Sequence, residues 1–119
     1  MEYTPSRFLS LWGSTSLADP RVRFYDDEVI FSHAPTEDYF KAGLWCSSVS
    51  AYCQSHRQVF SKTVLCENGC VYPDNHVNIE VFMCKHMMEF ETLGPLANLA
   101  KGGACSHVEE WRLQKAPDR

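Results

Sequence analysis

Residues 24–33 have the sequence Phe24-Tyr25-Asp26-Asp27-Glu28-Val29-Ile30-Phe31-Ser32-His33, and the prediction of the fold starts from them. The two adjacent aspartates are typical of a turn, because short carboxylates bond nearby backbone amides. Residues 28–33 then predict a β-strand, since their centre is β-branched and aromatic. Pro35 ends the strand because it lacks an amide hydrogen. A strand that ends in Ser-His beside a loop favours a functional site at that junction.

Two amphipathic helices are predicted on either side of this strand. The first covers residues 5–12, because Thr4 is a suitable cap and Phe8, Leu11 and Trp12 share one helical face. The second begins at Thr36, and apolar residues at helical spacing extend it toward residue 60. Gly43 and the serines at 47, 48 and 50 weaken that helix and favour a break within it.

The rest of the chain predicts mainly strands and turns. Residues 76–86 alternate apolar and polar side chains, which indicates a long strand that is buried on one face. Asn68-Gly69 is typical of a tight turn. The remaining predicted segments are a strand at 61–66, a hairpin partner at 70–72, a continuation or bend at 87–91, and a strand at 104–113.

Length and composition favour one globular domain over residues 1–119. The chain is 45% hydrophobic and 22% charged, which is ordinary for a folded domain. A formal charge of −4 argues against binding to nucleic acid through phosphates. No apolar run is long enough to span a membrane, and the first residues lack the features of a signal peptide. A cytoplasmic location with mostly reduced cysteines is therefore expected.

The sequence FYDDEVIFSHAP, followed by Gly43 and a helical segment, resembles the opening motif of the ketosteroid isomerase-like superfamily. That group includes SnoaL-type polyketide cyclases, scytalone dehydratase and the nuclear transport factor proteins. Residues 106–113 are similar to its late, pocket-lining strand, and the resemblance spans roughly residues 8–114. It implies an α+β cone, in which helices pack on a strongly curved, mostly antiparallel sheet around an internal pocket. It also implies a homodimer, and the family's usual last strand has no counterpart here.

The resemblance further implies a cofactor-independent isomerase, cyclase or dehydratase for a hydrophobic, oxygenated molecule of polyketide or terpenoid type. Ser32 falls where ketosteroid isomerase has its aspartate base, so a proton shuttle centred on His33 or another histidine is expected instead. Glu109 falls near the position of the oxyanion-stabilising acid. The candidate catalytic residues are Tyr25, Ser32, His33, His107 and Glu109, and the candidate substrate-binding residues are Phe31, Trp45, Phe82 and Trp111.

Less specific interpretations compete with this enzyme. Any single histidine here is more commonly structural than catalytic, and the aromatic residues are more commonly part of a core. A non-catalytic module that binds a small molecule or a protein is the main alternative. Structural zinc on some of Cys66, Cys70, His76, Cys84, His86, Cys105 and His107 is a variant of it, although buried reduced cysteines also explain the pattern. A cysteine nucleophile would need a histidine partner, which the sequence alone does not identify.

Overall fold

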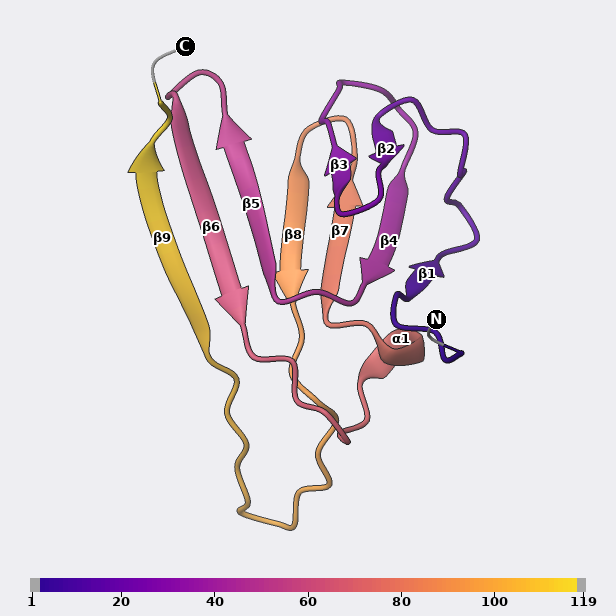
Figure 1. The fold of residues 1–119 in the computed structure, drawn as a ribbon, viewed down its shortest axis with the longest axis vertical. Coiled ribbons are helices and arrows are strands. Elements are labelled where there is room, and N and C mark those ends of the chain that lie inside the picture. The colour runs from indigo at the N-terminus through magenta and orange to yellow at the C-terminus, as the bar shows by residue number, and fades with distance from the viewer. Residues whose placement is uncertain (1–2, 118–119) are drawn as a thin grey trace.

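The computed structural model describes residues 3–117, which form nine strands, one four-residue helix and three antiparallel sheets (Figure 1). The four-stranded sheet has the order β1-β4-β7-β8, and β2 and β3 form a separate hairpin. The three-stranded sheet has the order β5-β6-β9. The strands are β1 (Leu9–Leu11), β2 (Val22–Phe24), β3 (Val29–Phe31), β4 (Phe40–Leu44), β5 (Ser48–Cys53), β6 (Gln58–Val64), β7 (Ile79–Met83), β8 (Met88–Thr92) and β9 (Glu109–Lys115), and the helix is α1 (Pro73–His76).

The predicted α+β cone is wrong, and with it the resemblance to the ketosteroid isomerase-like superfamily. The segment predicted as a long helix from Thr36 forms β4, β5 and the start of β6. In β5, serine alternates with valine and alanine, and this period of two outweighs an approximate helical spacing of larger apolar residues. Gly43 lies in β4, where it is buried against Val77. The predicted first helix is also wrong, because residues 9–11 form β1.

Several predicted strands are confirmed at their centres. The strand expected at 28–33 is β3, and the one expected at 76–86 contains β7. Residues 84–87 turn the chain, so the segment after β7 returns as β8. Residues 70–72, predicted as a hairpin partner, instead lead into α1, where Pro73 begins a turn with positive φ at Asp74 and Asn75. The late strand, β9, begins at Glu109 rather than at residue 104.

The hydrophobic core lies on one face of the four-stranded sheet. Phe40 faces Met83 across β4 and β7, and Ala42 faces Val81, and all four are buried. The β2–β3 hairpin covers part of this face through Phe31, whose ring centroid lies 5.8 Å from that of Phe40. The three-stranded sheet covers another part, with β6 packed against β8. The two covering elements therefore lie over the same apolar face, one on each side of the space between them.

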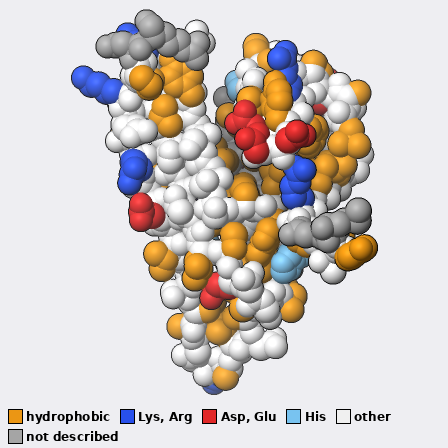
Figure 2. Space-filling model, viewed as in Figure 1, with side chains coloured by type: hydrophobic (Ala, Val, Ile, Leu, Met, Phe, Trp, Pro, Cys, Tyr) orange, Lys and Arg blue, Asp and Glu red, His pale blue; other side chains and the backbone are white. Residues whose placement is uncertain are grey.

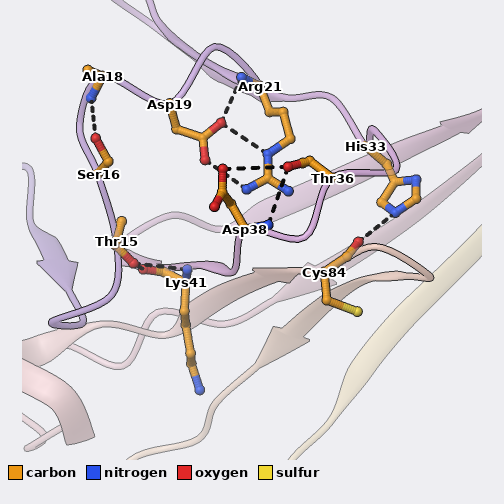
Figure 3. Close-up of polar contacts among 10 residues, drawn as sticks. All are labelled: Thr15, Ser16, Ala18, Asp19, Arg21, His33, Thr36, Asp38, Lys41 and Cys84. Carbon is orange, nitrogen blue, oxygen red and sulfur yellow. Dashed lines mark hydrogen bonds and ion pairs between the residues drawn. The ribbon is translucent and has the colours of Figure 1, made fainter.

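A buried ion pair shapes the loop that leads into the hairpin (Figure 3). One carboxylate oxygen of Asp19 accepts hydrogen bonds from the backbone N–H and Nε of Arg21, at 2.9 and 3.0 Å. The other oxygen accepts one from Nη2 at 2.7 Å. The Arg21 side chain is 5% exposed, so the two charges are largely removed from water. The hydrogen bonds from Arg21 lower the pKa of the Asp19 carboxyl below its ordinary value.

We expect Asp19→Asn to lower the free energy of unfolding by about 1–3 kcal/mol at neutral pH, because it leaves a buried guanidinium without its carboxylate. A carboxyl whose pKa is lowered by folding stabilises the fold above its unfolded pKa, and this contribution disappears as pH falls through the folded value. The stability difference between the variant and the wild-type protein should therefore begin to shrink as pH falls below about 4, the ordinary carboxyl value, and should continue to shrink until pH is below the lowered pKa of Asp19. Urea denaturation across acidic pH measures this, with the exposed Asp27→Asn as the matched control. A constant difference at every pH would contradict the prediction.

Candidate functional site

A groove of about 1260 Å³ lies between β5 and the β2–β3 hairpin. Its floor is the apolar face of the four-stranded sheet, where Ile79, Val81, Met88 and Phe90 line it. Figure 2 shows the molecule hollowed between the three-stranded sheet on the left and the hairpin on the right. The groove is thus a part of the core face that neither covering element closes. Met88 and Phe90 are half-buried on its floor, whereas Ile79 and Val81 are buried.

Strand edges form the two walls of the groove. β7 and β8 contribute alternate residues, as strands do when a face lines a cavity. All six residues of β5 and all three of β3 line it instead, so these strands turn their edges toward the space. β5 has a free edge because its only neighbour in the sheet order of residues 3–117 is β6. The walls therefore offer backbone donors and acceptors.

The hydrogen-bond pattern shows which groups of β5 are free for a ligand. The N–H of Val64 donates to the carbonyl of Ser47 at 2.9 Å, which makes these two residues a hydrogen-bonded pair. Such pairs alternate along an antiparallel ladder. Val49, Ala51 and Cys53 therefore bond to β6. The backbone groups of the residues between them, Ser48, Ser50 and Tyr52, point to the outer edge and into the groove. The carbonyl of Ser48 accepts from Sγ of Cys46 at 3.5 Å, so the free groups are the N–H of Ser48 and both groups of Ser50 and Tyr52.

The groove collects several of the residues predicted as a site. Tyr25, Phe31, Ser32, His33 and Trp45 all line it. His33 donates from Nε2 to the backbone carbonyl of Cys84 at 2.9 Å (Figure 3). This hydrogen bond joins the hairpin to the turn between β7 and β8. His33 is exposed and has a visible structural role, which does not by itself assign it a catalytic one.

His107, Glu109 and Trp111 form a second cluster, which is not part of the groove lining. The hydroxyl of Thr92 donates to Oε1 of Glu109 and lies 2.8 Å from Nε2 of His107. Trp111 donates from Nε1 to Oε2 of Glu109 at 2.6 Å. The hydrogen bond from Thr92, helped by Trp111 and Lys62, lowers the pKa of the Glu109 carboxyl. Glu109 therefore links β9 to β8 through its hydrogen bond with Thr92, and its carboxyl group is a poor proton donor at neutral pH.

Phe82 lies apart from both clusters. It points away from the core face and stacks on Tyr39, with ring centroids 6.0 Å apart. The sequence-predicted residues thus fall in three places rather than in one pocket. The zinc hypothesis finds no support either, since no three His, Cys, Asp or Glu side chains within residues 3–117 come together as a metal site. The six cysteines are free.

The turn between β5 and β6 holds a thiol–imidazole pair that sequence analysis missed. Sγ of Cys53 lies 3.3 Å from Nδ1 of His56 and 3.4 Å from the hydroxyl of Ser55, and these last two are 2.9 Å apart. Hydrogen bonds from Ser55 and His56 lower the pKa of the Cys53 thiol to about 7. Cys53 and Ser55 also line the end of the groove. The Cys-x-x-His spacing was the available signal, but it lay inside a segment predicted as helix.

Comparison with known proteins does not assign the chain to a family. It matches no family model, and neither the curated proteins nor the solved structures gave a match. Among residues 3–117, no helix has the length and apolar character needed to cross a membrane.

Proposed function

We propose that this chain is a protein-interaction module that binds an extended peptide segment in the groove by adding a strand to β5. The observation that supports the proposal is the combination of a free β5 edge on one wall with an apolar floor. An incoming strand can pair its backbone with β5 while alternate side chains reach the floor. This is the chemistry of β-strand addition, in which main-chain hydrogen bonds give affinity and side-chain pockets give specificity.

The dimensions of the wall define the ligand class. β5 has six residues and so presents an edge of about 20 Å. A segment of about six extended residues matches that length. Its side chains at every second position would meet Met88 and Phe90, the half-buried residues of the floor, so they should be apolar. The side chains between them would face solvent and should be polar.

The acid/base enzyme expected from sequence stays a prediction. The fold that implied it is wrong, although Tyr25, Ser32 and His33 share the groove with the strand edges. A small-molecule substrate would need polar side chains aimed at its reacting atoms, whereas a peptide needs free backbone groups along a wall. The backbone groups of β5 favour the peptide. The two ligand classes are separated by whether binding depends on the ligand's own amide hydrogens.

Fluorescence anisotropy with paired synthetic peptides tests the proposal. The probe is a fluorescein-labelled peptide of about six residues in which valine alternates with threonine. Its partner has the same side chains but carries N-methyl groups on the amides of alternate residues, in two versions that together cover every amide. We expect one N-methylated version to bind at least about fivefold more weakly, because it loses two or three hydrogen bonds worth roughly 0.5–1.5 kcal/mol each. Equal affinity for all three peptides would overturn strand addition.

Two tryptophan substitutions locate the binding site on the protein. Ala51 is half-buried and lines the groove, so Ala51→Trp should obstruct it and abolish measurable binding of the valine–threonine peptide. Thr63 lies on the adjacent strand β6, is exposed and is not part of the groove lining, so Thr63→Trp should leave affinity unchanged. Circular dichroism melts establish that both variants fold. Binding that survives Ala51→Trp would place the peptide elsewhere.

A further inference from the structure

β9 is the longest edge strand within residues 3–117. It has seven residues, and each pairs in unbroken register with one residue of β6, so no bulge twists the edge away. It lies last in the order β5-β6-β9, and Figure 1 shows it at the outer side of the molecule. Proteins usually protect such edges with charged side chains, proline, a bulge or a covering loop, and of these β9 has the charged side chains, at residues 109, 110, 112 and 115. β9 contains no proline, and its outer row of backbone groups is available for pairing with another strand.

The register fixes which backbone groups point outward. The N–H of Ala116 donates to the carbonyl of Arg57 at 2.8 Å, which continues the ladder one step beyond the strand. Because hydrogen-bonded pairs alternate, Gln114, Arg112 and Glu110 also bond to β6. The other four residues direct their N–H and C=O groups to the free edge: Glu109, Trp111, Leu113 and Lys115.

The same four residues share one face of the strand and form an apolar patch with charged ends. Trp111 and Leu113 are each 64% exposed. The ring of Trp111 contacts that of Phe60 edge-on, with centroids 5.4 Å apart, and this holds it on the sheet. Glu109 lies before the apolar pair and Lys115 after it, and the carboxylate of Glu109 already accepts from Thr92 and Trp111 and lies 3.5 Å from Nζ of Lys62. The strand thus has an acidic beginning and a basic end, which is the pattern that is complementary to itself when reversed.

We propose that β9 pairs antiparallel with β9 of a second copy of this chain, about a two-fold axis at Arg112. In this register Trp111 of each copy is opposite Leu113 of the other, and Glu109 is opposite Lys115. All seven residues pair, and the outward backbone groups of both strands meet as hydrogen-bonded pairs. Arg112 faces its own copy on the axis, with Glu110 of the other strand diagonal to it and within reach of a long side chain. The two Arg112 side chains are the one pair of like charges in this register, whereas a parallel arrangement in register would place Glu109, Glu110, Arg112 and Lys115 each opposite its own copy.

The total surface of the chain is consistent with a partner. The accessible area is 9066 Å². A folded monomer of this mass is expected to expose roughly 6,600 Å², so the chain exposes about 2,500 Å² more. A standard interface buries roughly 800 Å² of each partner, well within that excess. The radius of gyration, 16.0 Å, likewise exceeds the roughly 13.5 Å expected for a compact domain of this length.

Light scattering after size exclusion, on the full chain at micromolar concentration, gives the first test. The expected mass is twice the 13.6 kDa of one chain. Leu113→Pro removes one outward N–H without removing a bond to β6, so it should reduce the mass to that of a monomer. Leu113→Thr keeps the N–H and should remain a dimer. A monomeric wild-type protein, or a dimer that survives Leu113→Pro with its fold intact, would overturn the proposal.

Cysteine cross-linking then tests the register, in a background of Cys53→Ser and Cys105→Ser to remove the exposed native thiols. Residues on the axis form a pair without hydrogen bonds, with Cα atoms about 4.5 Å apart, which a disulfide can span. Arg112→Cys should therefore cross-link to itself under mild oxidation. Glu110→Cys and Gln114→Cys should each fail alone and cross-link when mixed. Self-linking by Glu110→Cys, or none by Arg112→Cys, would overturn this register. Peptide binding in the groove does not involve β9, so the two proposals fail separately.

Discussion

Asn78→Leu should lower the free energy of unfolding by roughly 2–5 kcal/mol, a large part of the stability of a domain of this size. Asn78 is fully buried, and its side chain bonds both backbone groups of Cys46. Its carbonyl oxygen accepts from the N–H of Cys46 at 2.9 Å, and its amide donates to the carbonyl of Cys46 at 2.8 Å. Leucine matches the volume but leaves both groups without partners, and each such group costs about 1–3 kcal/mol.

Loss of these side-chain hydrogen bonds should affect several elements, because Asn78 lies where they meet. Its backbone also bonds Leu44 and Leu93, so one residue connects the end of β4, the approach to β5 and the segment after β8. Urea denaturation followed by fluorescence measures the change. Gln54→Leu, which alters an exposed amide in the β5–β6 turn, should change stability by less than about 0.5 kcal/mol. Equal stability losses in the two variants would contradict this role for Asn78.

The Cys53 thiol should react with iodoacetamide with a pH midpoint near 7. An ordinary cysteine has a pKa near 8.5, so at pH 6 the thiolate fraction of Cys53 is about thirtyfold higher. The lower basicity of that thiolate reduces its intrinsic reactivity several-fold, which leaves a net rate advantage of about sixfold at pH 6. Mass spectrometry of the alkylated peptides measures the rate at each cysteine. Cys46 is the internal contrast, because burial raises the pKa of its thiol.

The partners of Cys53 provide the matched variants. Ser55→Ala with His56→Asn removes both side-chain hydrogen bonds and should move the midpoint toward about 8.5. Neither residue belongs to the core, so the melting temperature should stay within a few degrees of the wild-type value. A midpoint that stays near 7 in the double variant would show that these two side chains do not activate the thiol.

The sequence predicted the strands that are rich in β-branched and aromatic residues, and it missed the strands that are not. β3 and β7 were predictable from runs of β-branched and aromatic residues. The turn at Asn68-Gly69 was predictable because glycine readily takes a positive φ, which Gly69 adopts. The helix predicted after Thr36 failed because its apolar spacing fits two periods. Phe40 and Leu44 are four residues apart, a separation that shares a face in a helix and in a strand. Sheet pairing decided between them, and pairing is not visible in a single segment.

The candidate site likewise has one part that local sequence could predict and one part that it could not. Tyr25, Phe31, Ser32 and His33 are sequence neighbours, so placing them together needed only the local turn and strand. The opposite wall of the groove depends on which edge of β5 remains free, and that follows from the order of strands in a sheet. The Cys53–His56 pair could have been suspected in either structure, since residues three apart are also neighbours on a helix. The tight turn, with positive φ at Arg57, is what brings the thiol and the ring together.

The pairing of β6 with β9 has a consequence for how the chain assembles. β5 and β6 are joined by a short turn, so they can pair soon after both are synthesised. β9 begins at Glu109, far along the chain from Val64, its partner at the end of β6. Contacts between residues so distant in sequence form slowly, because the intervening chain must first be ordered. During synthesis β6 therefore keeps one open edge until β9 emerges, and we expect the nascent chain to be most prone to aggregation in that interval.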